Sequence, residues 1–562
     1  MNPADKRTIQ FRLSNDALFI GGFIIGVLCF LFIYDRKILD VTYSAWILTS
    51  PDPDISQHYL GAIHFMKSGW RFPVGLFDSL SYPDPMSVIW TDSIPGVCLI
   101  LKLFRSFLPQ GFQFFGWYGL ISFGLTGGVS AVVIRTLIDS PLVSLLLSPV
   151  FVLSFPVLQL LYYHTALASH WLILLALLGF LQESSWSLKK RVSFWSVLGM
   201  LCVMIHSYFL PMIGVIMLAG EFLLLLQGKN PLRVSPIPVA GFCISGLFTL
   251  WILGAFTTPV NHSGYMIGGF NANLNTFWNS LGSGLLTGIE NKYGTQYEGF
   301  AYLGLGMLLM LILASLTLAV KAFRKKAPVK QLILLHPTAF SIGCMFFVFL
   351  VISVFPEADL NTRTLIPDLV PNFIKSALGV FRSNGRFIWP AMYLLMISSV
   401  YVLYRYSARL SFFIILFICV FLQFADIFPY AKEKHSVYFA NRYYMNVFDQ
   451  TALNRLIQGY RHIVLVDDNV TAMMACADYA YRYDMTLNRF YFARDINDRI
   501  NERLDRYRTG QEDKEGVLFI FYDRAQLSDW LEAGLHFYEY GSDGIVLGSE
   551  IPLFGLEELI YE

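Results

Sequence analysis

Long apolar runs fill the first three quarters of the chain and restrict it to folds that lie in a lipid bilayer. Of the 562 residues, 55% are hydrophobic and only 14% are charged. Soluble globular chains carry about 25% charged residues, so most of this chain must face lipid or pack against segments that do. The first run, residues 17–34, follows Lys6, Arg7 and Arg12 and has no small-residue cleavage site after it. We expect an uncleaved signal anchor with a cytoplasmic N-terminus.

Further apolar runs follow the first one. They lie near residues 93–108, 113–134, 142–160, 166–182, 193–209, 211–227, 236–256, 299–320, 334–355, 386–404 and 410–428. If every run crossed the bilayer, the end of the chain would return to the cytoplasm, whereas the basic clusters described next require an odd number of crossings. Either the 93–108 run is partial or re-entrant, or a longer run hides a hairpin. We predict about 11–13 transmembrane helices.

Four basic clusters set the expected orientation of these helices. They are Lys189–Arg191, Lys229–Arg233, Lys321–Lys326 and Arg405–Arg409. Basic loops prefer the cytoplasmic side of a membrane. The loops 35–91, 257–298 and 356–385, together with the segment after residue 429, should therefore lie on the opposite, extracytoplasmic face.

The character of the chain changes after the last apolar run, where charged residues become frequent. Two short apolar runs, Ile463–Val466 and Val517–Phe521, are typical of strands, and a helical pattern lies between them near 485–508. This alternation predicts a transmembrane domain over 1–429 and a soluble extracytoplasmic α/β domain over 430–562. The second domain has no glycine-rich phosphate loop, so we expect no nucleotide there.

Charge and cysteine content argue against two other classes of protein. The chain has 41 basic and 40 acidic residues, a formal net charge of +1, and lacks the basic surface expected of a nucleic-acid-binding protein. Its seven cysteines are isolated, with no CxxC pair and no Cys/His ligand spacing. We therefore expect neither a disulfide framework nor a structural zinc, and we assign no metal ligands.

The first extracytoplasmic loop carries a dense group of polar side chains at residues 50–59. Pro51 and Pro53 are expected to stop any helix and to hold Asp52 and Asp54 in a short extended turn. A carboxylate fixed at a membrane face can accept a proton from a substrate arriving from water or along lipid, which makes Asp54 a candidate general base. The alternative is that both acids simply favour a turn.

The same loop continues with a short helical pattern and a second acid. His58, Ala62 and Phe65 fall on one face at i, i+4 and i+7 spacing, which predicts an amphipathic helix along the membrane surface. Asp92 lies just before the 93–108 run. It could take part in catalysis, or it could cap the N-terminus of the next helix, and the sequence favours neither.

The loop 257–298 contains amides, hydroxyls and aromatic rings, and it includes His262. Such groups suit a sugar, because polar groups match its hydroxyls and rings stack on its C–H faces. Taken alone, however, the stretch favours an ordinary Gly/Asn-rich loop. It ends at Tyr297 and Glu298, and an acid placed directly against the next apolar run is costly to maintain without a function.

Arg382 and Arg386 lie at the extracytoplasmic end of an apolar run. Arginine offers several donors to phosphate. The alternative is that these arginines anchor the helix end at the membrane interface. The preference of basic residues for the cytoplasmic side argues against that alternative. Their spacing could place both on one helix face, and we expect at least one to bind phosphate. His164 and His170, near another run, are candidates to contact phosphate or acceptor, although each is more often a packing residue.

Five of these segments, in this order, resemble the membrane glycosyltransferases of the GT-C fold. They are also similar to an uncharacterised bacterial multi-pass family within that superfamily, related to YfhO-like proteins. The matching pieces are Asp54–Tyr59, Thr91–Pro95, His164–Leu174, Tyr297–Gly304 and Phe381–Trp389. The segment after residue 430 has no useful match.

The resemblance implies a polyprenyl-phosphate-linked sugar donor used on the periplasmic face of the bacterial inner membrane. Asp54 would act as the base on a hydroxyl of a cell-envelope glycan, such as O-antigen or a wall polymer, with inversion at the anomeric carbon. Arg382 or Arg386 would stabilise the leaving phosphate. Some relatives use a divalent metal such as Mg²⁺ or Mn²⁺, and the sequence leaves open whether this chain does.

The candidate residues fall into two groups. The catalytic candidates are Asp54, Asp92 and Glu298, and the candidates for substrate binding are Gln57, His58, Tyr59, His164, His170, His262, Tyr297, Arg382 and Arg386. Two other functional classes stand beside the enzyme: a transporter or flippase of a lipid-linked sugar, and a structural or assembly protein. A transporter should show internal pseudo-symmetry or charges at mid-membrane, whereas the polar clusters here collect in loops on one face, which favours an enzyme.

Overall fold

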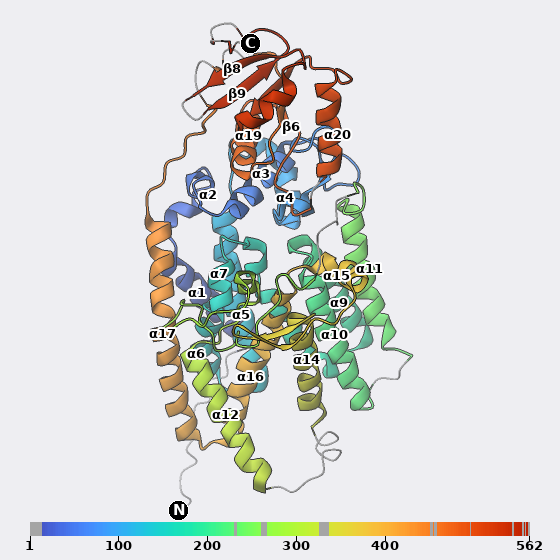
Figure 1. Ribbon diagram of the computed structural model, residues 1–562. Helices are drawn as coiled ribbons and strands as arrows, with labels where there is room; N and C mark the ends of the chain where they lie inside the picture. The colour runs from blue at the N-terminus through green and yellow to red at the C-terminus, as the bar shows by residue number, and fades with distance from the viewer. Residues whose placement is uncertain are drawn as a thin grey trace, which may run out of the picture.

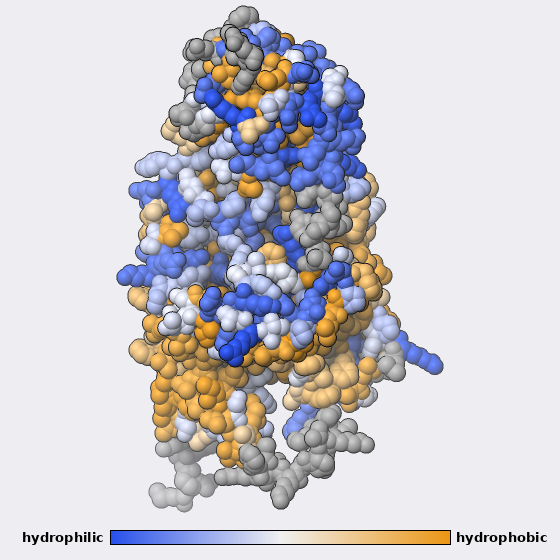
Figure 2. Space-filling model, in the orientation of Figure 1, coloured by the Kyte–Doolittle hydropathy of each residue, from blue (hydrophilic) through white to orange (hydrophobic). Residues whose placement is uncertain are grey.

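The computed structural model describes residues 14–229, 233–259, 267–324, 336–449, 453–454, 458–494, 496–541, 544–553, 556 and 558–559. A bundle of long helices forms the lower part of the molecule in Figure 1, and a small sheet domain from the end of the chain lies at the top. The short helices α3 (Pro53–Lys67) and α4 (Pro95–Leu103) lie between these two parts. Hydrophobic residues cover the lower helices and polar residues dominate the upper part (Figure 2).

Seven described helical segments are long and apolar enough to cross a membrane. They are α1 (Asn15–Ile33), α5 (Phe115–Leu137), Thr165–Ser185 around α8 (Trp171–Gln182), α10 (Phe209–Leu226), α14 (Pro337–Val354), Asn384–Tyr406 with α16 (Ile388–Tyr406), and α17 (Arg409–Phe439). Shorter or more basic helices stand beside them: α6 (Pro141–Val152), α9 (Leu188–Ile205), α11 (Pro236–Ile252) and α12 (Leu305–Arg324). Their length and composition indicate an integral membrane protein, as expected, but with fewer full-length spans in the described ranges than the 11–13 predicted.

The 93–108 run is too short to be a transmembrane helix. It forms α4, which has nine residues, followed by a 3-10 turn at Arg105–Phe107. Nine residues rise about 14 Å, less than half of the roughly 30 Å hydrocarbon core of a bilayer. The 142–160 run is likewise divided, between α6 and α7 (Phe155–Leu160). Of the two alternatives considered for the surplus crossing, the short α4 agrees with a partial segment at 93–108.

The basic ends of the helices are grouped at one end of the bundle. The end of α12 and the turn between α16 and α17 lie near the N-terminus, opposite the C-terminal domain (Figure 1). Arg191 departs from the expected interfacial position, because it is buried between two acids. Its Nε donates to Glu183 Oε1 at 3.1 Å, and its Nη2 donates to Glu221.

Small residues allow α1 and α5 to pack closely. Gly22 and Gly26 of α1 lie one turn apart and face the backbone of α5, where added Cβ atoms would collide with the carbonyl oxygens of Gly127 and Phe123. Small residues four positions apart are a common means by which membrane helices approach one another. Gly21, by contrast, faces only the flexible end of Leu145.

The C-terminal domain is built on a five-stranded mixed sheet with the order β6-β5-β7-β9-β8. The strands are β5 (His462–Leu465), β6 (Thr486–Leu487), β7 (Val517–Phe521), β8 (His536–Tyr540) and β9 (Ile545–Ser549). β5 is parallel to β6 and β7, whereas β9 is antiparallel to β7 and β8. Helices α19 (Val470–Arg482) and α20 (Asn497–Arg508) make the crossovers that parallel strands require.

Both strands predicted for this domain are present, but its boundaries differ from the prediction. The expected helix near 485–508 begins only at Asn497, because residues 486–487 pair with β5 as a strand. Helix α19 was not predicted. Helix α17 contains Pro429 and continues to Phe439. The C-terminal domain therefore begins after Phe439, and the predicted boundary at residue 430 falls inside this helix.

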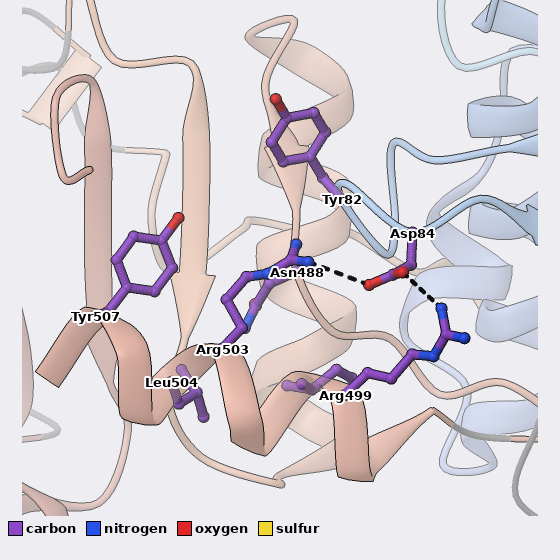
Figure 3. Close-up of a pocket in the computed structure, with 8 residues that line it drawn as sticks. Tyr82, Asp84, Asn488, Arg499, Arg503, Leu504 and Tyr507 are labelled. Atoms are coloured by element: carbon purple, nitrogen blue, oxygen red, sulfur yellow. Dashed lines mark hydrogen bonds and ion pairs between the residues drawn. The ribbon is translucent and has the colours of Figure 1, made fainter. Parts of the chain in front are cut away.

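Helix α3 is present as the sequence predicts, but the prediction that it lies along the membrane surface is wrong. Every residue from 55 to 66 is buried, because the C-terminal domain covers the helix. His64 contacts the Ala477 carbonyl oxygen at 2.9 Å and Ser79 Oγ at 3.0 Å. At the edge of this interface, Asp84 lies 2.9 Å from Arg499 and 3.4 Å from Arg503, both on α20 (Figure 3).

Replacing Gly26 by alanine is expected to loosen the contact between α1 and α5. The added methyl group meets the backbone of Phe123, which cannot move aside as a side chain would, and overpacking of this kind costs about 1–3 kcal/mol. The matched control Gly21→Ala meets only the end of Leu145 and should leave stability nearly unchanged. Thermal unfolding in detergent measures both variants, and equal midpoints would contradict the packing described.

Candidate functional site

The first part of the site is the N-terminus of α3, which separates the roles of two neighbouring acids. Pro53 occupies the first turn of the helix, where its missing N–H costs nothing. Asp52 is the N-cap, and its Oδ1 accepts a hydrogen bond from the Asp54 N–H at 2.8 Å. The expectation that the prolines stop any helix is therefore wrong, since Pro53 starts one. The Asp54 carboxylate takes no part in this cap, and its Oδ2 lies 3.3 Å from His164 Nδ1.

Burial makes Asp54 a weaker acid than an exposed aspartate. Its side chain is 17% exposed, and this desolvation raises the pKa of the carboxyl to about 6. The nearby carboxyls of Asp52 and Asp92 raise the pKa further, while the charges of His164 and Arg386 oppose them. A carboxylate with a pKa close to neutrality is well matched to proton transfer.

A buried ion pair lies on the other side of His164. Arg386 makes a two-pronged contact with Glu298, with Nε 2.7 Å from Oε2 and Nη2 2.8 Å from Oε1. His164 Nε2 lies 3.8 Å from Glu298 Oε1, so one imidazole connects Asp54 to this pair. Although burial alone would raise the pKa of Glu298, Arg386 and His164 lower it well below its usual range. Glu298 is therefore held ionised and cannot take up a proton near neutral pH.

Both partners of the pair are held by rigid loops. Glu298 lies on a 3-10 turn, η6 (Gly294–Gly299), and Arg386 on another, η8 (Asn384–Phe387). The Asn384 amide donates to the carbonyl oxygens of residues 352, 353 and 355 at 2.8, 3.2 and 2.6 Å. The Arg386 guanidinium also lies over the ring of Tyr208, 5.0 Å from its centroid.

The amides of the 257–298 loop bond to their neighbours within the protein. Gln296 donates to Asp359 at 2.9 Å and to Asn271 at 3.1 Å, and accepts from Asn273 at 3.1 Å. These bonds fix η6, the turn that carries Glu298. They agree with the interpretation of this stretch as an ordinary Gly/Asn-rich loop. His262 lies outside the residues that the structure describes.

Asp92 faces a histidine that sequence reasoning missed. Asp92 ends the short turn η2 (Val88–Thr91) in a left-handed conformation, with φ of 50°, and its Oδ1 lies 3.5 Å from His206 Nε2. It does not cap α4, whose N-cap residue is Ile94. Burial raises the pKa of Asp92 and lowers that of His206. His206 is a single histidine after an apolar run, without a motif that would have identified it.

His58 is a buried neutral imidazole beside this cluster. Its ring centroid lies 6.4 Å from that of His164, and burial lowers its pKa to about 3. Neither of its ring nitrogens has a hydrogen-bond partner among the described residues. Burying a polar group without a partner is costly, so His58 is suited to bind a polar group of a ligand.

Four other predicted binding residues differ in their distance from the cluster. Tyr297 lies beside it, with its hydroxyl 3.1 Å from that of Tyr163. Gln57 donates to the Tyr491 carbonyl oxygen in the C-terminal domain, and the Tyr59 hydroxyl donates to the Gly111 carbonyl oxygen at 2.8 Å. His170 packs among helices, 2.9 Å from the Tyr393 hydroxyl. The structure places Gln57, Tyr59 and His170 in packing or docking contacts.

Arg382 lines a cavity of about 450 Å³, which none of the residues of the cluster lines. The cavity also contains Lys375, Asp368 and Glu357, and Phe270 lies under the Arg382 guanidinium at 5.6 Å. Of the two predicted arginines, Arg386 is engaged by Glu298, and Arg382 is one of the residues that line this cavity. Arg382 also acts electrostatically on Asp92, which connects the cavity to the site.

The described residues do not form a metal-ligand set. No three His, Cys, Asp or Glu side chains within them are placed to hold an ion together. Asp54 and Asp92 each face a histidine, and Glu298 is occupied by Arg386.

The fold and this cluster define a helical membrane protein with a soluble domain docked over a charged site. A family model described as "Domain of unknown function (DUF6311)" matches residues 23–428, and one described as "DUF6311 C-terminal domain" matches residues 452–550. The chain therefore belongs to the DUF6311 family. No curated protein matches it.

Removing one partner of the buried ion pair is expected to destabilise the protein strongly. In Glu298→Ala the Arg386 charge stays buried without its carboxylate, and such a loss costs about 3–5 kcal/mol. Arg508→Ala is the matched control, because Arg508 pairs with Asp505 on the surface of its own helix and the loss of such an exposed pair costs about 0.5 kcal/mol. Thermal unfolding in detergent compares the two, and similar midpoints would show that the pair does not stabilise the fold.

Proposed function

We propose that this protein is an inverting glycosyltransferase of the GT-C type. It moves a sugar from a polyprenyl-phosphate donor to a cell-envelope glycan, such as O-antigen or a wall polymer. The observation that carries the proposal is the Asp54 carboxylate, which is free of the helix cap beside it and faces a cluster with two arginines at the end of a membrane helix bundle. A base, a fixed cation and a lipid-facing scaffold together suit a donor that is anchored in the membrane.

In the proposed reaction, the acceptor hydroxyl oxygen attacks the anomeric carbon from the side opposite the phosphate. The bond from that carbon to the phosphate oxygen breaks, and polyprenyl phosphate leaves with the bonding electrons. The hydroxyl proton passes to the Asp54 carboxylate, and the anomeric configuration is inverted. His164, whose Nδ1 lies 3.3 Å from Asp54 Oδ2, is placed to hold the carboxylate in position for this transfer.

The arginines would act on the leaving phosphate in different ways. Arg382 lines the 450 Å³ cavity and can donate directly to phosphate oxygens. Arg386 is fixed by Glu298 and contributes a positive charge that needs no rearrangement as the leaving group becomes more negative. His58, neutral and buried, is suited to hold a sugar hydroxyl.

The orientation proposed for the reaction follows from the distribution of charge along the bundle. The site lies toward the end that the C-terminal domain covers, away from the basic ends of α12 and α16 (Figure 1). If those basic ends are cytoplasmic, the site opens on the periplasmic face of a bacterial inner membrane. That is the face on which polyprenyl-phosphate sugars act as donors in the enzymes that the sequence resembles.

A flippase or transporter of a lipid-linked sugar is the second candidate, and the buried trio of Arg191, Glu183 and Glu221 favours it. Buried charges in a membrane domain often mark a transport path. Here, however, Glu183 ends one helix and Arg191 lies in the first turn of the next, so the trio lies near helix ends. Sugar transfer by the purified protein, compared with movement of labelled lipid across vesicles, separates the two functions.

Asp54→Asn is expected to lower sugar transfer by about 10²–10⁴-fold, because the amide cannot accept the proton. The fold should survive or gain stability: the raised pKa shows that burying the charged form of Asp54 is unfavourable. Asp52→Asn is the matched control, since asparagine caps a helix as well as aspartate. The assay supplies purified protein with a polyprenyl-phosphate hexose and a glycan acceptor. Full activity in a folded Asp54→Asn protein would rule out the assigned base.

The rate of transfer should depend on pH through Asp54. The base is active when deprotonated, so kcat/KM should fall about tenfold per pH unit below about 6 and level off above it. Burial raises this pKa most and the Asp52 carboxylate adds to it, so Asp52→Asn should shift the limb downward because a negative charge is lost. A profile that is flat between pH 5 and 8 at unchanged folding would contradict Asp54 as the titrating base.

A further inference from the structure

One short segment of the C-terminal domain touches three stretches of the chain around the candidate site. The segment 488–494 follows β6, and its Tyr491 carbonyl oxygen accepts a hydrogen bond from Gln57. The Ala493 N–H donates to the Trp90 carbonyl oxygen at 2.7 Å. Arg494 Nη2 donates to the carbonyl oxygens of Gly379 and Val380, at 3.3 and 3.1 Å.

These partners are close in sequence to the residues of the site. Gln57 is three residues after Asp54, Trp90 is two before Asp92, and Val380 is two before Arg382. These three stretches come from two loops that are far apart in the sequence, the first loop (35–91) and the loop 356–385. A single segment that bonds to all three can therefore set their distances from one another.

The rest of the domain is held firmly against the first loop. Leu487 N–H donates to the Ser79 carbonyl oxygen, and Tyr82 N–H donates to the Leu487 carbonyl oxygen, each at 2.9 Å. The Tyr82 ring stacks on His462 with centroids 4.2 Å apart, and Asp84 lies between Arg499 and Arg503 (Figure 3). Such contacts are those of a built interface rather than of a tethered module.

We propose that the C-terminal domain completes the active centre and that Arg494 is a positioning residue for the phosphate-binding arm, residues 379–386. Arg494 is 7% exposed, and its guanidinium reaches two successive carbonyl oxygens that a shorter or single-donor side chain could not hold together. It thereby places Arg382 beside the cavity and keeps Arg386 opposite Asp54. Its charge also acts on Asp92, which places the side chain within electrostatic reach of the site.

The chemical class of the ligand follows from this arm. Arg382 and Arg386 are set at the membrane end of the site, and Arg494 adds a third guanidinium from the opposite domain. A phosphomonoester anchored to a lipid is the group that such an arrangement suits. The inference rests on the proposed function for this ligand, whereas the positioning of residues 379–386 is independent of it.

The experiment uses the full chain in nanodiscs with two readouts. The first is hydrogen exchange of the backbone at residues 379–386, and the second is binding of 55-carbon polyprenyl phosphate without sugar. Arg494→Gln should speed exchange of the arm at least tenfold and weaken binding at least tenfold, with the midpoint of global unfolding unchanged. Arg494→Lys should recover part of both, since it restores the charge and a nitrogen with several donors but lacks the planar guanidinium.

Arg508→Gln is the matched control, because Arg508 lies on α20 of the same domain and pairs with Asp505 within its own helix. It should change neither readout. If Arg494→Gln exchanges like the wild type, the positioning role is overturned, whatever the ligand. If the arm exchanges faster but wild-type protein does not bind polyprenyl phosphate, the positioning role stands and the proposed lipid donor fails.

Discussion

A buried arginine–glutamate pair at the mouth of the helix bundle is the interaction on which the candidate site depends. Arg386 and Glu298 are both nearly inaccessible, and their two-pronged contact offsets the large cost of removing each charge from water. The pair can exist only because two 3-10 turns are held rigidly, one by the Asn384 amide and one by the Gln296 network. A large part of the loop chemistry thus serves to place one cation and one anion.

Two acids close to the same histidine have pKa values shifted in opposite directions because of this pair. Glu298 receives the arginine, and its pKa falls well below the usual range; Asp54 receives only the histidine, and burial raises its pKa to about 6. Neighbouring carboxyls whose environments push their pKa values apart are the usual arrangement for dividing acid–base work. Here Asp54 is left as the group that can exchange a proton, and Glu298 as the fixed charge that orients His164 and Arg386.

The sequence predicted those parts of the site that depend on residue type and missed those that depend on register. Carboxylates and arginines next to apolar runs are costly, and this cost, together with the chemistry of arginine and the resemblance around Asp54, drew attention to Asp54, Glu298 and Arg386 in three distant segments. The choice among neighbours was harder. Along a helix, successive side chains point about 100° apart, so Gln57 and Tyr59 face the C-terminal domain and Gly111 instead of His164.

The remaining differences have a common cause in tertiary contacts. The sequence pattern of α3 is typical of a surface helix because its apolar stripe is narrow, and its polar residues are buried because α19, α4 and η2 pack around it. His206 could not be predicted, because its role comes from the left-handed turn that points Asp92 toward it. Composition and apolar length, by contrast, do not depend on such contacts, and for that reason the helical membrane fold and the C-terminal sheet were predicted correctly.

The docked C-terminal domain explains how a charged site can work at a membrane face. Electrostatic interactions weaken when water reaches them, and the loops of a membrane protein are open to water unless something covers them. Segment 488–494 covers this site and bonds to the loops that carry its acids and arginines. A soluble domain is better suited to this role than another membrane helix, because its backbone can be polar and still lie over the reacting groups. Under the proposed function, the membrane domain would hold the lipid-linked donor and the C-terminal domain would keep water from the charged cluster.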